Sequence, residues 1–254
     1  MSRKDLRELC SAPNESRTAQ SGELFRYWVA LGSNSIDAGE QLAEAGKRLA
    51  SLSTTSVAVS SYYRTQPIGP AEHPFLNAAA QFCSRRTPHD LLAALQRLEG
   101  DAGRTQHGTR WGDRPLDLDI VAAARDERPV ECDDATLRLP HPLAHLRRFV
   151  LDPLVELPSP QPRLRSGKAD ECRVRLLKRP LRVAGVAAEH LPAVAIATGV
   201  HATAAIDLRP GGRDAGLLRF VPLPPEAARA AIVAMACDEP VRVAQTGPVQ
   251  FAPR

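Results

Sequence analysis

The sequence predicts an α+β fold in which an antiparallel sheet carries helices on one face. Two observations predict it: apolar alternation marks strands, and apolar residues at three- and four-residue spacing mark two helices between them. Up to residue 122 the order is strand, helix, strand, strand, helix, strand. This is the order of the split βαβ, ferredoxin-like arrangement, whose second sheet face is free to carry a site.

The first half of this unit follows from short patterns. The apolar run at 27–31 predicts a strand that Gly32-Ser33-Asn34 ends. Apolar residues at helical spacing predict a helix over 39–52, and alternation predicts a strand over 56–64. The loop at 65–70 contains two prolines, which fix φ and remove donors, so we expect it to be rigid.

The second half begins with a strand expected over 75–84. Thr87 is the expected N-cap of the next helix, Pro88 its first residue and Glu99 its last. The last strand follows a Gly-containing, charged loop and begins at the Asp-x-Asp sequence. Beyond it we expect a polar hairpin at 125–134, an extended stretch at 137–142, and two short helical segments at 144–149 and 150–157.

The Asp-x-Asp sequence is the strongest chemical signal in the chain. Asp117 and Asp119 are two apart, so on a strand both carboxylates point to one face. Two adjacent carboxylates repel each other, and a divalent cation such as Mg²⁺ removes that cost. Arg110 and Arg114 can bind phosphate oxygens bidentately. Asp-x-Asp alone is more typical of an edge strand with a solvated acidic face, but the flanking Arg-Trp-Gly-x-Arg sequence shifts the balance toward a metal–phosphate site.

Composition limits the classes of protein. The 254 residues carry a net charge of +4 and 43% hydrophobic residues, which is enough for a sizeable core. The five scattered cysteines argue against a disulfide framework and indicate a reducing compartment. No apolar run reaches the length of a membrane span, and no basic stripe with interleaved aromatics indicates nucleic acid. We expect a cytoplasmic protein that contacts neither membrane nor nucleic acid.

The sequence divides into three regions. Residues 1–24 are polar and predict a disordered arm, residues 25–160 form the main domain, and residues 161–254 form a C-terminal module of unknown function. The module opens with a basic run at 163–182, interpreted as a solvated linker or strand pair, with an anion-binding patch as the alternative. A small α+β appendage follows. Its expected elements are strands at 193–197 and 217–223, a helix at 226–236, and a return to the sheet at 241–244.

The main domain resembles the 6-hydroxymethyl-7,8-dihydropterin pyrophosphokinase family over residues 27–160. The matching pieces, in the family's order, are Ala30-Leu31-Gly32-Ser33-Asn34, Ser60-Ser61-Tyr62-Tyr63-Arg64-Thr65 with Pro67 and Gly69-Pro70, Phe75-Leu76-Asn77-Ala78, Gln96-Arg97-Leu98-Glu99, Gly103-Arg104, Arg110 to Ile120, Pro140-His141-Pro142, and Arg147 to Leu154. The resemblance implies transfer of a pyrophosphoryl group from ATP to the hydroxymethyl group of the pterin, with release of AMP, in folate synthesis.

The resemblance also implies a role for each matching residue. Asp117 and Asp119 would hold two Mg²⁺ ions, and Arg104 and Arg114 would stabilise the charge that develops on the transferred group. Trp111 resembles the tryptophan of a mobile loop that closes over the site. The ATP-binding residues implied in this way are Gln96, Glu99, Arg110, Trp111, His141 and Arg147.

For the pterin, Phe75 and Phe149 resemble two rings that sandwich a flat heterocycle, and Asn77 resembles the amide that reads its edge. The resemblance adds Thr65, Pro67 and Ile68 to this wall. Taken singly, Phe75, Phe149 and Ile68 are more typical of plain core, and the alternative for Asn77 is a turn-capping or strand-end amide. Three positions depart from the family's usual residues and predict weaker binding of ATP or pterin: Gln106, Phe75 and Thr136.

Two alternatives to a pterin pyrophosphokinase stay open. One is a pterin- or nucleotide-binding protein without turnover, regulated through its C-terminal module. The other is a related diphosphotransferase that acts on a different heterocyclic alcohol. Folate-pathway enzymes are the expected protein partners, because members of this family are sometimes fused to them. The C-terminal module carries no signature of such an enzyme.

Overall fold

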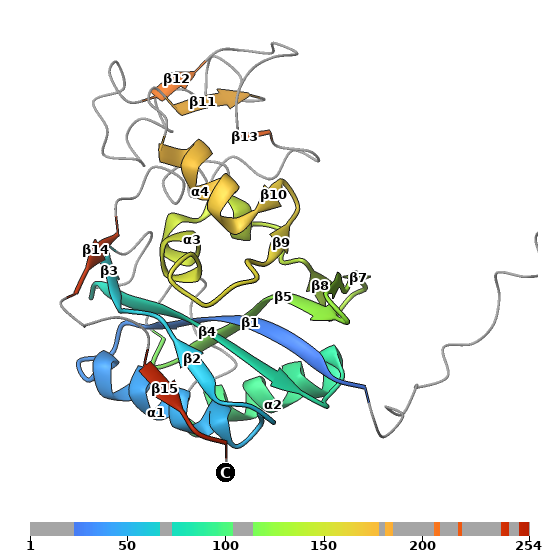
Figure 1. Cartoon of the computed structure of the whole chain (residues 1–254). Coiled ribbons are helices and arrows are strands. Elements are labelled where there is room, and N and C mark those ends of the chain that lie inside the picture. Colours follow the sequence, from blue (N-terminus) through green and yellow to red (C-terminus); the bar gives the residue numbers. More distant parts are fainter. Residues whose placement is uncertain are drawn as a thin grey trace, which may run out of the picture.

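A mostly antiparallel sheet forms the centre of this α+β protein (Figure 1). The computed structural model describes residues 23–66, 73–103, 114–177, 181–184, 206–208, 218–219, 240–243 and 249–253. The strands of the main sheet are β1 (Phe25–Ser33), β2 (Val57–Val59), β3 (Tyr63–Thr65), β4 (Phe75–Ser84), β5 (Asp117–Arg125), β6 (Arg128–Pro129), β14 (Val241–Arg242) and β15 (Val249–Phe251). The helices are α1 (Ala38–Ala50), α2 (Pro88–Asp101), α3 (Arg148–Leu154) and α4 (Ala169–Leu177), with a 3-10 turn, η2 (Ala144–Leu146).

Strand β1 is the central strand of the sheet. The strand order is β14-β3-β4-β1-β5-β6, and β2 pairs with both β4 and β15. β1 is antiparallel to β4 on one side and to β5 on the other, with Gly32 opposite Asn77 and also opposite Asp117. Three strands that are far apart in the sequence therefore meet at the end of β1 where Gly32 lies.

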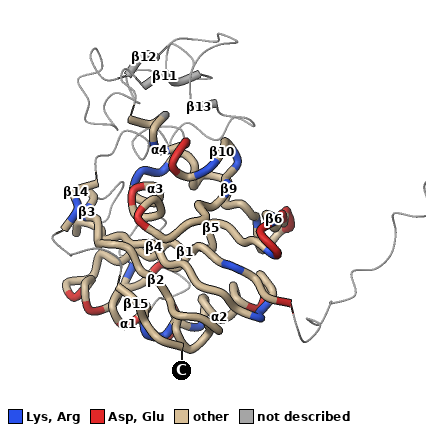
Figure 2. The backbone as a smooth tube through the Cα atoms, viewed as in Figure 1, with Lys and Arg blue, Asp and Glu red and all other residues tan. Residues whose placement is uncertain are grey.

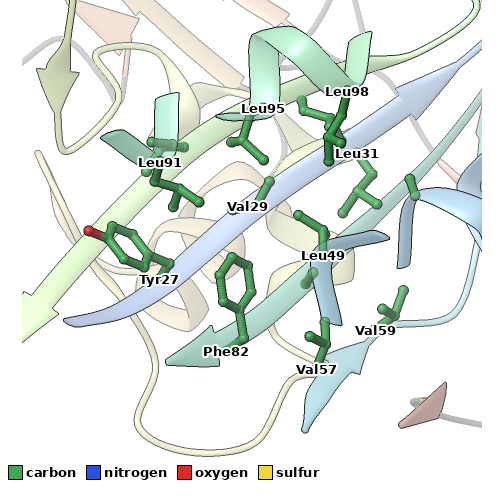
Figure 3. Packing of buried hydrophobic residues seen from close by; sticks show 14 of the residues in the cluster. Tyr27, Val29, Leu31, Leu49, Val57, Val59, Phe82, Leu91, Leu95 and Leu98 are labelled. Atoms are coloured by element: carbon green, nitrogen blue, oxygen red, sulfur yellow. The ribbon is translucent and has the colours of Figure 1, made fainter. Parts of the chain in front are cut away.

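One face of the sheet packs on α1 and α2. Alternate residues of β1, which include Tyr27, Val29 and Leu31, point into this core (Figure 3). Leu49 of α1 and three leucines of α2 close it from the other side; those three are Leu91, Leu95 and Leu98. These are the positions at which the sequence repeats apolar residues at helical spacing. Burying such side chains is worth about 1.5–3 kcal/mol each, so this core is a main source of stability.

The opposite face is also covered, which corrects the expectation that all helices lie on one face and leave the other free. Trp28 of β1, Val150 and Leu151 of α3 and Leu176 of α4 belong to a second buried cluster. Arg148 of α3 and Arg173 of α4 both donate to the carboxylate of Asp152 on α3, over 2.7 Å each, and the bond from Arg173 joins the two helices. Figure 2 shows acidic and basic positions gathered on α3, α4 and β10. Because α3 and α4 cover part of this face, only the remaining part is open to a ligand.

Local structure confirms several expected boundaries. The strand β4 spans 75–84 as predicted, and Thr87 caps α2 by accepting a hydrogen bond from the backbone N–H of Asp90. The strand expected over 56–64 is instead two strands. Ser60 lies between them, and its hydroxyl accepts the N–H of Ala79, which takes the place of a regular ladder bond. The helical segments near 144–157 divide at Arg147, because that residue is extended, with φ −114° and ψ 104°.

Further short strands complete the described chain. Strands β7 (Cys132–Asp133) and β8 (Arg138–Leu139) form a hairpin. Strands β9 (Arg163–Leu164) and β10 (Gly167–Lys168) form the strand pair expected in the basic run. Strands β11 (Leu181–Ala184), β12 (Ile206–Leu208) and β13 (Leu218–Arg219) form a small parallel sheet. No helix in the described ranges is long and apolar enough to cross a membrane.

The basic run also contains a helix that the sequence interpretation did not include. α4 forms because Ala169, Cys172 and Leu176 bury one face against α3, so residues 169–177 are neither linker nor strand. The predicted return of residues 241–244 to the sheet is confirmed at Val241–Arg242, which form β14. The strand expected at 217–223 is confirmed at 218–219, and its other residues lie outside the described residues. Residues 1–22 of the arm expected at 1–24, the strand expected at 193–197 and the helix expected at 226–236 also lie outside them.

Candidate functional site

Strand β5 places the two aspartates on the sheet face away from α1 and α2. Leu118 and Ile120 are buried in the core beneath, whereas Asp117 and Asp119 are partly exposed. This alternation confirms the predicted separation of carboxylates from apolar side chains. Two carboxylates on one face supply the hard oxygen ligands that Mg²⁺ prefers.

Gly32 lies between the aspartates and the amide of Asn77. A Cβ atom on Gly32 would lie 3.6 Å from Oδ1 of Asn77 and 3.9 Å from Cβ of Asp117. Asn77, Gly32 and Asp117 therefore form one row across β4, β1 and β5. Since glycine has no side chain, no side chain stands between the amide and the carboxylate in this row, and we call this position the gap at Gly32.

Asn34 holds the backbone of Arg114, which lies three residues before Asp117. Its side-chain oxygen accepts the N–H of Arg114 over 2.6 Å, and its own N–H donates to the Arg114 carbonyl over 3.2 Å. The guanidinium of Arg114 then donates from Nη1 to Oδ1 of Asp117 over 2.9 Å. Asn34 is buried, so this connection between the end of β1 and the start of β5 is shielded from solvent. Arg114 is thereby held beside the acidic pair.

A second cationic group approaches the same carboxylates from the start of α3. Burial lowers the pKa of Arg147, while the charges of Asp119 and Asp117 act to raise it. Among the described residues, Nε of Arg147 is buried without a hydrogen-bond partner. Its guanidinium carbon lies 5.7 Å from the centre of the Phe149 ring. Arg147 therefore has a donor available for an anionic ligand next to the acidic pair.

His141 belongs to this electrostatic cluster as well. Its pKa is lowered to about 3, chiefly by burial and also by the charge of Arg147, while the charge of Asp117 acts in the opposite direction. Nδ1 of His141 accepts the N–H of Leu143 over 3.2 Å. The imidazole is therefore neutral near pH 7 and carries its proton on Nε2, which makes Nε2 a donor.

Glu99 bonds to the backbone that carries the aspartates. Its side chain is buried at the end of α2, and Oε1 accepts the N–H of Leu118 over 2.8 Å. Leu118 lies between the two aspartates, so Glu99 supports the backbone that carries them. Gln96, one turn earlier, is exposed on α2. The two residues thus differ in exposure, and the ATP contact expected of each stays a prediction.

Three of the residues expected around a pterin, Thr65, Phe75 and Asn77, lie on the neighbouring strands β3 and β4. Nδ2 of Asn77 donates to Oγ1 of Thr65 over 3.0 Å and to the carbonyl of Tyr63 over 3.3 Å. Phe75 pairs with Thr65 in the ladder and is partly exposed, as is Phe149. Asn77 and Thr65 are therefore neighbours, in agreement with a shared role.

Some expected site residues cannot be placed. Those that lie outside the described residues are Arg104, Arg110, Trp111, Pro67 and Ile68, together with the departure at Gln106. Thr136, another departure, donates from both its N–H and its hydroxyl to Oδ1 of Asp134 over 2.8 Å. The described part of the site thus contains the acidic pair, Arg114, Arg147, His141, and the Asn77–Thr65 pair.

Sequence reasoning missed two supporting residues. In the sequence, Gly32 and Asn34 mark the end of a strand and belong to a matching piece, and neither is predicted to have a role in the site. Their signal was present: a glycine and an asparagine that directly follow a buried strand are typical of a close backbone approach and of side chains that bond nearby backbone. What the sequence could not supply was the partner, because Arg114 is 80 residues away.

The fold and site together define an α+β protein whose sheet face combines paired carboxylates, arginines and a neutral histidine. That combination suits a metal–polyphosphate ligand. The family model for 7,8-dihydro-6-hydroxymethylpterin-pyrophosphokinase (HPPK) matches residues 28–159, about half of the chain. The chain belongs to this family.

Individual relatives agree with the family. The chain is 40% identical to 2-amino-4-hydroxy-6-hydroxymethyldihydropteridine pyrophosphokinase of Haemophilus influenzae over 54% of this chain and 83% of the relative. It is 41% identical to the protein of the same name from Pseudomonas aeruginosa, over 56% and 86%. It is also 38% identical to a mitochondrial folate synthesis bifunctional protein of Pisum sativum, over 58% of this chain and 28% of the relative.

Proposed function

We propose that this chain transfers pyrophosphate from ATP to 6-hydroxymethyl-7,8-dihydropterin in folate synthesis. Membership of the pyrophosphokinase family carries this conclusion, and relatives about 40% identical over most of their own length agree with it. ATP is the co-substrate, and the products are AMP and the pterin diphosphate. Because AMP leaves, the hydroxymethyl oxygen attacks the β-phosphorus, and the bond from that phosphorus to the oxygen shared with the α-phosphate breaks.

We further propose that Asp117 and Asp119 hold two Mg²⁺ ions. The donor set fits: both carboxylates point to one face, and no side chain of Gly32 fills the space beside them. Bound Mg²⁺ neutralises charge on the phosphate oxygens and orients the attacking and leaving oxygens. In this proposal Arg114 has two roles, because the guanidinium that now pairs with Asp117 is also within reach of a phosphate bound there.

The cationic and neutral donors have distinct tasks in this scheme. Phosphoryl-type transfer depends mainly on positioning and charge stabilisation. The guanidinium of Arg147 donates to the phosphates, because its buried Nε has no hydrogen-bond partner among the described residues. His141 donates from Nε2 without adding a positive charge. Arg104, Arg110, Trp111 and Gln96 stay proposals from family resemblance alone.

Pterin recognition is assigned to the β3–β4 edge. Since both hydrogens of the Asn77 amide have acceptors within β3, its Oδ1 is the atom that faces the gap at Gly32. We propose that Oδ1 accepts from the pterin edge, while Phe75 and Phe149 cover the two ring faces. Thr65 fixes the Asn77 amide, and Pro67 and Ile68 continue this wall.

Three broader proposals accompany the function. The β1-α1-β2/β3-β4-α2-β5 order with its antiparallel pairing supports a ferredoxin-like split βαβ unit at residues 25–160. Residues 161–254 are proposed as a C-terminal module of unknown function whose strands β14 and β15 join the main sheet, and residues 1–24 as a disordered arm. The bifunctional plant relative supports folate-pathway enzymes as partners.

The decisive experiment measures AMP release by the full chain with ATP, Mg²⁺ and 6-hydroxymethyl-7,8-dihydropterin. We expect pterin-dependent AMP release that Asp117→Asn and Asp119→Asn each reduce by at least about a hundredfold. Asp133→Asn is the matched control, because Asp133 is exposed and pairs only at the surface with Arg138. If the unaltered chain binds pterin but releases no AMP, the protein is a binding protein rather than an enzyme.

A further inference from the structure

Strand β14, from the C-terminal part of the chain, lies along β3. Val241 pairs with Arg64 and Arg242 with Tyr63, and the N–H of Val243 donates to the carbonyl of Tyr62 over 2.8 Å (Figure 1). β3 has only three residues, and without β14 it would be the edge of the sheet. Short edge strands are held by few hydrogen bonds and open easily. β14 thus adds a partner to the strand that carries Thr65.

The side chain of Arg242 strengthens this attachment. Its Nε lies 3.0 Å from Oε1 of Glu156, and its Nη2 donates to Oγ of Ser61 over 2.7 Å. The same carboxylate of Glu156 accepts the N–H of Ser61 and the hydroxyl of Tyr63, each over 2.8 Å. Glu156 is largely buried, whereas half of the Arg242 side chain is exposed. Figure 2 shows basic positions on β14 and β3 at this edge.

This cluster continues directly to the proposed pterin contact. The hydroxyl of Tyr63 donates to Glu156, and the carbonyl of Tyr63 accepts from Nδ2 of Asn77. Thr65, two residues further on the same strand, accepts from the same amide nitrogen. The position of β3 therefore determines the direction in which Oδ1 of Asn77 points. Arg242 is connected to that amide through the bonds of Glu156 and Tyr63 and does not contact it.

We propose that Arg242 is a positioning residue for pterin binding and that β14 is part of the pterin pocket's support. The proposal rests on the function proposed above. Arg242 lies outside the region matched by the family model, residues 28–159. The C-terminal part of the chain, to which no activity is assigned, thus gains a specific role: it holds the strand that orients Asn77 and Thr65.

The first test is steady-state kinetics of Arg242→Gln in the full chain. We expect the KM for the pterin to rise about threefold to tenfold, while kcat and the KM for ATP change less than about twofold. Arg242→Lys keeps the charge and should recover about half of the lost affinity on a logarithmic scale. Arg125→Gln is the matched control, because Arg125 forms an exposed ion pair with Glu23 at the other end of β5. A pterin KM equal to that of the control overturns the proposal.

A second readout does not depend on turnover. The side-chain amide resonances of Asn77, assigned by their loss in Asn77→Asp, should shift in Arg242→Gln and stay unchanged in Arg125→Gln. Unshifted resonances overturn the positioning role. A general loss of folding would instead move resonances throughout the chain and lower the apparent kcat without a selective rise in the KM for the pterin, and that result also contradicts the proposal. If the unaltered chain releases no AMP, the proposed function fails, and the resonances alone decide the role of Arg242.

Discussion

The carboxylate of Glu99 accepts the backbone N–H of Leu118 over 2.8 Å, at the one residue that separates Asp117 from Asp119. A helix end is thereby bonded to the backbone of the acidic pair. An acceptor removed from a buried N–H costs about 1–3 kcal/mol. Glu99→Ala should therefore lower the free energy of unfolding by that amount, whereas Glu99→Gln, which keeps an acceptor oxygen, should lower it by less than half as much.

Denaturant unfolding of the two variants measures this difference. The matched kinetic measurement is the Mg²⁺ concentration that gives half-maximal AMP release, which should rise in Glu99→Ala because the aspartates lose their support. If Glu99 instead serves mainly as an ATP contact, both variants should raise the KM for ATP, and neither should change the free energy of unfolding.

The gap at Gly32 predicts an effect on activity without an effect on folding. A Cβ there makes only ordinary contacts, at 3.6 Å from Asn77 Oδ1, so Gly32→Ala should fold normally. It fills part of the space between the amide and Asp117, and misplacement of about 1 Å costs up to about a hundredfold in rate. We expect kcat/KM for the pterin to fall about tenfold to a hundredfold, and further in Gly32→Val.

Gly39→Ala is the matched control for this prediction, because no atom lies within 4 Å of a Cβ at Gly39. Thermal unfolding of all three variants checks that they fold. Full activity in Gly32→Val would show that the row from Asn77 to Asp117 does not face the substrates.

The buried His141 predicts a pH dependence of stability. Burial depresses its pKa to about 3 in the folded state, from an ordinary value of about 6.5. Below pH 6.5 the unfolded chain therefore binds a proton that the folded chain excludes, and stability is lost as the pH falls toward 3. Relative to His141→Gln, the unaltered chain should lose up to about 1.4 kcal/mol per pH unit in this window.

Denaturant unfolding between pH 4 and 8 tests the prediction as a difference between the two proteins. His73→Gln is the control, since His73 is exposed before β4. A difference between the unaltered chain and His141→Gln that stays constant with pH would show that folding does not lower the pKa of His141.

Gly46 of α1 and Phe251 of β15 should be coupled. A Cβ on Gly46 would lie 2.7 Å from Cε2 of Phe251, so Gly46→Ala must displace the ring. In a helix interior, alanine is otherwise favoured over glycine by about 0.5–1 kcal/mol. Gly46→Ala should therefore destabilise the unaltered chain but stabilise a Phe251→Ala background. A double-mutant cycle of unfolding free energies measures this change of sign, and additive effects would mean that β15 does not pack on α1 in solution.

Much of the fold was predictable because local patterns determine it. β4 and the capped start of α2 follow from alternation, a threonine and a proline, and the sorting of Asp117 and Asp119 from Leu118 follows from strand geometry alone. The covering of the second sheet face was not predictable, because Trp28 looks like any strand residue until α3 packs on it. The same limit explains Glu99, whose partner Leu118 is set by how α2 docks on β5.

The site was predictable in its composition more than in its connections. Residue types and spacing indicated the acidic pair, and resemblance supplied His141 and Arg147, which the structure brings near it. The links that hold the pair in place join residues distant in sequence, such as Asn34 with Arg114 and Arg242 with Glu156. No local pattern contains them.

The strands β14 and β15 also constrain the order in which the protein can be completed during synthesis. β3 and β2 leave the ribosome well over a hundred residues before Val241 and Val249, the first residues of their outer partners. Until those partners emerge, the nascent sheet has two open edges that can pair with another chain. A chaperone that shields these edges during translation would increase the yield of folded protein, and a chain truncated before residue 240 would remain prone to aggregation at the same edges.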